Sequence, residues 1–265
     1  TTLNDRAGLL ESQGRYAEAD LLYLRAIEIG EKSLGPDHPN LATRLNNRAE
    51  LLRSRGKYVE AARLYERCQA ILEKALGPNH PNVATVLNNR AGLLSKQGEY
   101  AEAEPLYDRS QAIRENVLGP EHADVATTLS GRAELLERQG KYAKAESLYE
   151  RSQAIRERVL GPEHPDVATT LNNLARLLLS QGKYAEAEQL YERSEAVRDK
   201  ALDPDHPDVA RSLNDRALLL DKKEHYTGAV PLLERALSIR MKKLGENHPD
   251  TVSTQNSLDI VRRKV

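Results

Sequence analysis

The sequence of 265 residues contains one cysteine, one methionine, no phenylalanine and no tryptophan. A lone thiol, Cys68, cannot form an intramolecular disulfide, so we expect a fold stabilised by burial in a reducing compartment, the cytoplasm. No stretch approaches the roughly 20 apolar residues that span a membrane. Lys and Arg total 39 against 40 Asp and Glu, and this net charge of −1 offers no broad attraction for phosphate backbones. We therefore expect neither a membrane nor a nucleic acid as partner.

Tyrosine is the aromatic residue that the sequence does contain, and its 11 copies reveal a repeat. When the sequence is aligned with itself at an offset of 42 residues, every tyrosine falls into one of two columns: Tyr16, Tyr58, Tyr100, Tyr142, Tyr184 and Tyr226, or Tyr23, Tyr65, Tyr107, Tyr149 and Tyr191. Glycines and alanines keep the same register. A fixed period of this size is typical of a solenoid or array.

Each period predicts a helical hairpin. Apolar residues recur at helical spacing in two stripes, one containing Leu45 and Ala49 and the next containing Tyr58 and Ala61. Gly56 is expected to end the first helix, and a Gly-Pro-x-His-Pro segment such as residues 35–39 ends the second helix and begins the next repeat.

These residues resemble the signature of the tetratricopeptide repeat, carried in the first copy by Leu3, Ala7, Gly14, Tyr16, Ala19, Tyr23 and Ala26. The resemblance implies an all-α fold, a right-handed superhelical solenoid of six hairpins with a C-terminal capping helix. We expect one domain over residues 1–265. Its repeats would cover about 1–35, 36–77, 78–119, 120–161, 162–203 and 204–245, and the capping helix about 249–265.

Two subtypes of the repeat are similar to this sequence. The 42-residue length and residues 160–168 and 171–173 resemble kinesin light chain repeats. The Asn-Asn-Arg-Ala segment at residues 46–49 is similar to repeats attached to NB-ARC nucleotide-switch modules. Because the sequence opens partway through a repeat, we expect an N-terminally truncated fragment whose upstream domain, on the same polypeptide, is a further partner.

No residue pattern predicts catalysis, a metal site or a cofactor. Six histidines recur in the inter-repeat loop, but successive helices lie about 8–10 Å apart, too far for one column to share an ion with bonds of about 2 Å. A loop or capping role is expected for them. Arg6, Arg48, Arg90, Arg132 and Arg216 share a column in which Leu174 is the exception, and we interpret these arginines as stems packed on the second helix with paired heads.

The polar arc of the first helices is the predicted binding face. It combines recurring asparagines, whose amides can pair with a peptide backbone of any sequence, with neighbours that differ from repeat to repeat. Leu179 and Leu218 are expected to form a small apolar pocket there. The candidate groove residues are Asn46, Asn47, Glu50, Arg53, Asn88, Asn89, Ser95, Lys96, Glu134, Glu137, Asn172, Asn173, Arg176, Leu179, Asn214 and Leu218.

The resemblance therefore predicts a non-enzymatic scaffold that binds a peptide or protein ligand in a concave groove. Its preferred setting is the ligand-sensing region of a switch protein of the NB-ARC and tetratricopeptide type. A cargo adaptor similar to kinesin light chain is the first alternative. An architectural spacer without a groove ligand is the second.

Overall fold

The computed structural model describes residues 2–265, and Thr1 lies outside the described part of the chain. Within residues 2–265 the structure contains thirteen helices and no strand, which confirms the predicted all-α repeat fold. The helices are α1 (Leu3–Ser12), α2 (Tyr16–Leu34), α3 (Pro39–Ser54), α4 (Tyr58–Leu76), α5 (Pro81–Gln97), α6 (Tyr100–Leu118), α7 (Ala123–Arg138), α8 (Tyr142–Leu160), α9 (Pro165–Ser180), α10 (Tyr184–Ala201), α11 (Pro207–Lys222), α12 (Tyr226–Leu244) and α13 (Pro249–Arg262). None of these helices has both the length and the apolar character needed to cross a membrane.

The starts of six odd-numbered helices, α3 to α13, are fixed by histidine. In each of them the histidine is the N-cap residue, and its Nδ1 atom accepts a hydrogen bond of 3.1 Å from the backbone N–H two residues later. Such a cap satisfies one of the N–H groups that a helix start leaves without an intrahelical partner. The structure thus confirms the predicted capping role of this histidine column.

A left-handed residue follows each odd-numbered helix from α1 to α11. Gly98 ends α5 with a φ of 85°, a conformation that costs glycine little. At the matching position after α11 stands Glu224, with a φ of 61°. It is the only non-glycine residue with a positive φ among residues 2–265.

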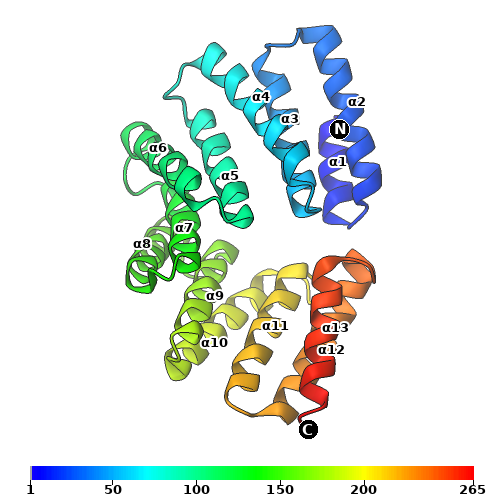
Figure 1. Ribbon diagram of the computed structural model, residues 1–265, viewed down its shortest axis with the longest axis vertical. Helices are drawn as coiled ribbons and strands as arrows, with labels where there is room; N and C mark the ends of the chain where they lie inside the picture. The colour runs from blue at the N-terminus through cyan, green and yellow to red at the C-terminus, as the bar shows by residue number, and fades with distance from the viewer. Residues whose placement is uncertain (1) are drawn as a thin grey trace. The chain divides into compact units, whose positions relative to one another are not determined.

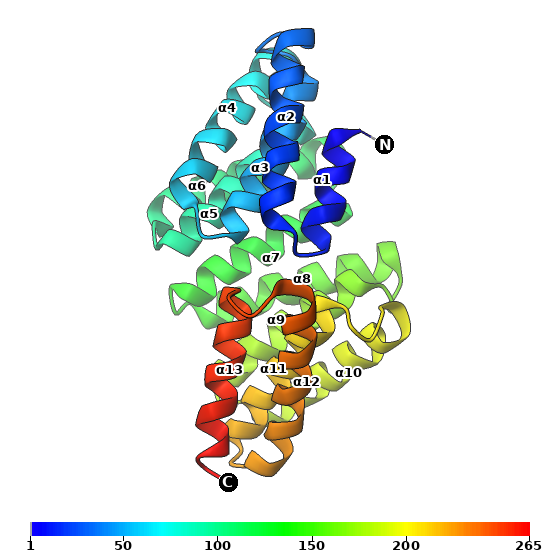
Figure 2. The same ribbon diagram turned by 90° about the vertical axis from the view of Figure 1, so that its right-hand side faces the viewer.

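The helices form two compact units, Thr1–Lys141 and Tyr142–Val265. In the first unit, consecutive odd-numbered helices contact one another, and each even-numbered helix packs on its own hairpin partner and on the next odd-numbered helix (Figure 1). The second unit repeats this pattern with α9 and α11, and α12 runs alongside α13 (Figure 2). Each unit is thus a stack of helical hairpins. The single domain over 1–265 stays a prediction.

The core of each unit is built from small residues facing tyrosines. Tyr65 and Tyr149 are fully buried, as is the alanine column that includes Ala49 and Ala175. The column that holds Cys68 and Ser110 is also buried, and its members bond to the backbone of the preceding helix: Cys68 Sγ donates to Ala42 O at 3.1 Å, Ser110 Oγ to Ala84 O at 2.7 Å and Ser194 Oγ to Ala168 O at 2.8 Å. The column is therefore a packing site between the two helices of a hairpin.

The junctions between repeats contain buried arginines that sequence analysis missed. Arg114 is 3% exposed, and its Nη1 donates to Thr128 Oγ1 at 2.7 Å and to Asp124 O at 2.8 Å. Burial lowers the pKa of the Arg114 guanidinium, although the Asp124 carboxylate partly opposes this effect. Arg156, Arg198 and Arg240 repeat the arrangement, with Thr170, Ser212 and Thr254 as their hydroxyl partners.

The first two junctions between repeats fill the same space with other residues. Leu72 and Val86, both buried, stand where later junctions have arginine and threonine. One repeat earlier the arginine comes from the opposite helix, because Arg44 Nη1 donates to Ala26 O at 2.5 Å and its head lies where a side chain on Gly30 would be. The residue in the second helix and the residue 14 positions later, in the first helix of the next repeat, therefore vary as a pair from one junction to another.

Candidate ligand-binding face

The asparagines of the first helices form hydrogen bonds between neighbouring repeats. Asn89 Nδ2 donates to Asn46 Oδ1 at 3.1 Å, and Asn47 Nδ2 lies 3.5 Å from Asn4 Oδ1. In the second unit Asn172 Nδ2 donates to Asp215 Oδ2 at 2.6 Å. Because partners lie 43 residues apart in each case, this asparagine ladder sets the register of one first helix on the next. Asn46, Asn47 and Asn89 are partly exposed, so their amides keep further donor and acceptor capacity.

The asparagine ladder is interrupted between α5 and α7. Asn88 Oδ1 is buried and has no partner within residues 2–265, because the matching position in the next repeat is Gly131. A Cβ on Gly131 would lie 2.7 Å from Cε1 of Tyr107, so the tyrosine ring excludes a side chain there. A buried carbonyl oxygen without a hydrogen bond costs about 1–3 kcal/mol.

Charged groups of both signs follow the odd-numbered helices of the first unit. Arg53 Nη2 pairs with Glu50 Oε2 at 2.5 Å, and the Tyr65 hydroxyl donates to the other oxygen of Glu50. Further along, Arg138 Nη2 pairs with Glu134 Oε1 at 2.9 Å. Between these pairs the side chain of Lys96 is exposed, and partial desolvation together with Arg53 lowers its pKa.

Burial also shapes the protonation of this face. Desolvation raises the pKa of Glu11, and the Glu50 carboxylate adds to the effect, although the Tyr23 hydroxyl donates to Glu11 Oε2 at 3.1 Å. Desolvation likewise raises the pKa of Tyr65. These tyrosines therefore stay neutral donors to carboxylates on the predicted binding face.

Not every predicted groove residue is accessible. Ser95 is 4% exposed, Asn172 is 2% exposed and Leu179 is 7% exposed, so these three face neighbouring helices instead of a ligand. Leu218 is 42% exposed beside the buried Leu179, which leaves one accessible apolar side chain where two were expected. Lys96 is also exposed, and the remaining predicted residues are partly exposed: Asn46, Asn47, Glu50, Arg53, Asn88, Asn89, Glu134, Glu137, Asn173, Arg176 and Asn214.

An apolar cavity of about 180 Å³ opens beside Asn46, at the junction that has Leu72 and Val86. Sequence analysis did not anticipate it, although the change from arginine and threonine to leucine and valine at this one junction is visible in the repeat alignment. Thr43, Asn82 and Thr85 add polar groups to its lining, and Ala42 and Cys68 complete its apolar part. The cavity combines apolar walls with hydroxyl and amide groups, as ligand pockets generally do.

Metal coordination is not indicated by the side chains present. Among the described residues no group of three or more His, Cys, Asp or Glu could hold a metal ion. Burial raises the pKa of the Cys68 thiol to about 12, so this sulfur is protonated at neutral pH.

A scan against protein families identifies the class of protein that this architecture represents. The tetratricopeptide-repeat model matches residues 1–74, 45–116, 82–156, 124–200 and 178–242. Because these matches cover most of the sequence, the chain belongs to the tetratricopeptide-repeat family, whose members are generally protein-interaction scaffolds.

Solved structures place the chain near kinesin light chain repeats. It is similar to nearly identical repeats from Podosopora anserina assigned to a kinesin light chain, at 27% identity over 75% of this chain and 94% of that one, with a TM-score of 0.58. BtubC (BKLC) from P. vanneervenii is 24% identical over 73% and 77% of the two chains, with a TM-score of 0.59. A Rap protein complexed with competence and sporulation factor shares the fold at 16% identity over 99% and 74%, with a TM-score of 0.71. Comparison with curated proteins gave no match.

Proposed function

We propose that this protein binds an extended segment of a partner protein along the first-helix face, and that the first unit supplies the selective contacts. The cavity beside Asn46 carries this proposal, because it has the size and lining to accept one apolar side chain. The charged pairs of Glu50 with Arg53 and of Glu134 with Arg138 then select the neighbouring residues of the segment.

The asparagine ladder supports the generic part of such binding. Amide N–H and C=O groups not used between repeats are free to pair with a peptide backbone, while the cavity and the charged pairs read side chains. Because Asn172 is buried, we assign this role to Asn46, Asn47, Asn88 and Asn89 and place the recognition in the first unit.

Two biological settings fit a scaffold of this kind. The Asn-Asn-Arg-Ala segment favours the ligand-sensing region of an NB-ARC-type switch protein, with a switch module on the same polypeptide. The similarity to the Podosopora anserina repeats favours an adaptor similar to kinesin light chain. A nucleotide-binding module or a coiled coil preceding this region in the complete gene product would distinguish them.

Selection from a random peptide library on the purified chain tests the proposal. The decisive variant is Leu72→Arg with Val86→Thr, which fills the cavity with the residue pair that the chain itself uses at later junctions. Val59→Ala is the matched control, because Val59 is 64% exposed on α4 and does not line the cavity. Folding of each variant is checked by circular dichroism.

We expect peptides that share an apolar residue to be enriched on the parent and on the control, and to be lost on the folded double variant. Equal binding of the peptides to the parent and to the double variant would show that the cavity does not accept a side chain of the partner segment. If no peptide is enriched on the parent, the spacer function becomes the better account.

A further inference from the structure

Two arginines of the first-helix column, Arg90 and Arg132, share one set of acceptors on the preceding second helix, whereas Arg48 pairs with Asp20 and Arg216 with Glu195. Arg132 Nη2 pairs with Asp108 Oδ1 at 2.6 Å, and its Nη1 donates to Gln111 Oε1. Arg90 makes the same two contacts with Glu66 and Gln69. A carboxylate 24 positions earlier and an amide 21 positions earlier therefore form one receptor for a guanidinium.

The glutamine of this receptor is held in position by a second carboxylate. Gln111 Nε2 donates to Glu115 Oε1 at 2.8 Å, which leaves its Oε1 atom turned toward the arginine. Gln69 is held by Glu73 in the same way, at 2.9 Å. The position of the acceptor oxygen is thus fixed by residues of the second helix alone and does not depend on the arginine.

In the second unit the receptor is complete but its arginine is replaced by Leu174. The acceptors are Glu150 and Gln153, and Gln153 Nε2 donates to Glu157 Oε1 at 2.8 Å, as in the second and third repeats. Leu174 is 6% exposed and too short to reach the acceptors as an arginine does. Within residues 2–265 no cation pairs with Glu150, whereas Glu157 pairs with Arg193 at 2.7 Å.

The last first helix shows that the protein elsewhere compensates for the same loss. Leu258 in α13 also stands in the arginine column, but Arg262, one turn later, pairs with Glu234 at 2.7 Å. Glu234 is the counterpart of Glu150. The counterpart of Arg262 in α9 is Leu178, which is 4% exposed and carries no charge.

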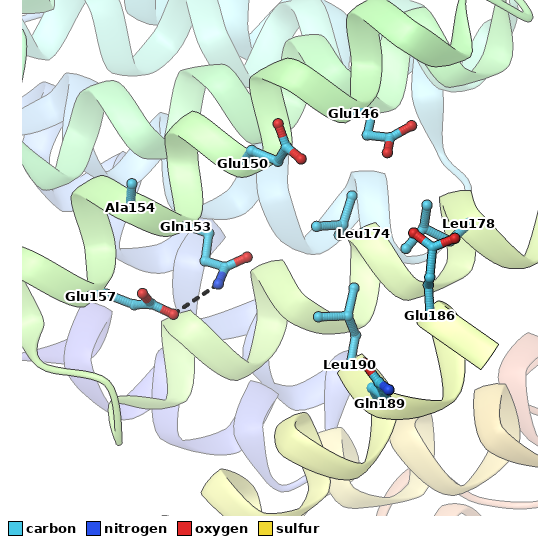
Figure 3. Close-up of a pocket in the computed structure, with 10 residues that line it drawn as sticks. All are labelled: Glu146, Glu150, Gln153, Ala154, Glu157, Leu174, Leu178, Glu186, Gln189 and Leu190. Atoms are coloured by element: carbon cyan, nitrogen blue, oxygen red, sulfur yellow. Dashed lines mark hydrogen bonds between the residues drawn. The ribbon is translucent and has the colours of Figure 1, made fainter. Parts of the chain in front are cut away.

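A cavity of about 440 Å³ occupies this place between α8, α9 and α10. Figure 3 shows Glu150 on α8 opposite Leu174 on α9, with Leu190 of α10 on the other side of Leu174. The apolar lining of the cavity is Ala154, Leu174, Leu178 and Leu190. Its polar lining is Glu146, Glu150, Gln153, Glu157, Glu186 and Gln189. Lys183 Nζ lies 3.1 Å from Glu146 Oε1, while Glu186 at the opposite rim is in no ion pair within the described residues.

We propose that this cavity, the Glu150 pocket, binds an arginine side chain of a partner protein. The apolar lining would cover the methylene stem, and Glu150 with Gln153 would accept the guanidinium N–H groups as their counterparts do in the second and third repeats. Arginine fits better than lysine, because a planar guanidinium presents two N–H groups to two separate acceptors, whereas an ammonium is a compact point charge.

Titration with blocked amino acids tests the proposal directly. The probes are N-acetyl-arginine methylamide, its lysine analogue and the neutral, isosteric citrulline analogue. The measurement is the NMR shift of the assigned methyl groups of Leu174, Leu178 and Leu190 in leucine-labelled protein. We expect the arginine probe to shift these methyl groups with a Kd at least fivefold lower than that of the lysine probe, and the citrulline probe to have no effect.

Two variants and one control separate the pocket from general charge attraction. Glu150→Gln is expected to weaken the arginine probe at least fivefold. Leu174→Arg, which restores the residue of the other repeats, is expected to fold and to abolish the shifts at Leu178 and Leu190. Glu28→Gln removes one exposed carboxylate from α2, in the other unit, and is expected to change nothing.

Equal effects of the arginine and citrulline probes would overturn the proposal, as would unchanged arginine binding in Glu150→Gln. Equal affinity for lysine would overturn the assignment to arginine. The Glu150→Gln result stands even if Leu174→Arg does not fold.

Discussion

Glu224 occupies the position after α11 at which earlier repeats end their first helix with glycine. Its φ of 61° is left-handed, and a residue with a Cβ pays about 1–2 kcal/mol for that conformation, whereas glycine adopts it readily. The backbone of the repeat thus requires the turn even where the side chain disfavours it. The surrounding hairpin contacts of α11 and α12 hold Glu224 in this strained state.

Replacing Glu224 by glycine is expected to stabilise the protein. Relief of the strained φ should raise the free energy of unfolding by about 1 kcal/mol, measured by urea unfolding and seen as a higher midpoint at unchanged slope. Glu224→Ala serves as the control, because it removes the carboxylate but keeps the Cβ. A gain for alanine as large as the gain for glycine would show that charge, and not backbone strain, is responsible.

At the scale of helices, the even-numbered helix of one repeat packs on the first helix of the next, and one recurring residue pair lies at each of these junctions. The later junctions bury an arginine with a threonine or serine, one junction buries leucine with valine, and one combines a buried glycine with the half-buried Arg44. Removing one partner of a buried polar pair leaves the other without a hydrogen bond, but replacing both by apolar residues of similar volume is often neutral. The chain itself contains both the polar and the apolar version.

A double-mutant cycle at Arg156 and Thr170 tests this pairing. Thr170→Val alone should destabilise by about 1–3 kcal/mol, because the buried guanidinium loses an acceptor. Adding Arg156→Leu reproduces the Leu72 and Val86 pair and should recover at least half of that loss. The cycle is read from urea unfolding of the parent, both single variants and the double variant. A coupling energy below about 0.5 kcal/mol would mean that the two residues act independently.

At the scale of the whole chain, stability is expected to be local, because each hairpin contacts only its neighbours in sequence within its unit. Cys68 reports on this property. Its thiol is fully buried and its pKa is raised to about 12 by burial, so a thiol reagent reacts only after local opening of the second repeat.

We expect Leu258→Ala in α13 to leave the native labelling rate of Cys68 unchanged, although it removes a buried side chain that packs against the last hairpin. Leu87→Ala, in the same apolar cluster as Cys68, should accelerate labelling at least tenfold, since such truncations cost about 2–5 kcal/mol. Labelling followed by mass spectrometry measures both rates. Equal acceleration by the two variants would indicate that the chain opens globally.

The repeat and the helix boundaries could be predicted because each of them depends on a residue type that recurs at one aligned position of the repeats. Histidine and proline mark helix starts, and the left-handed glycines mark ends, irrespective of what each helix packs against. The accessibility of Asn172 could not be predicted in this way. Its burial depends on Asp215 and Arg198, which approach it from two other helices.

Contacts between columns were the part that sequence reasoning missed. Sequence analysis predicts that the asparagines contact a ligand, whereas in the structure Asn46 and Asn89 form a hydrogen bond with one another. A helical wheel does not distinguish the buried arginine of the second helix from an exposed charged residue. The difference becomes visible only when its threonine partner, 14 positions later in the sequence, is considered together with it. Pairs of columns, compared across the six copies, carry this information.

The paired residues at the junctions limit how such a gene can change length. Loss of residues 170–211 by recombination between copies would bring Arg156 against Ser212, a pairing of the kind already used, and the shortened protein would keep a compatible interface. Loss of residues 44–85 would bring Gly30 against Val86, with neither the arginine nor the leucine that fills this space elsewhere. Expansion and contraction of the array are therefore tolerated toward the C-terminal repeats and disfavoured at the first junctions, beside the cavity assigned to ligand recognition.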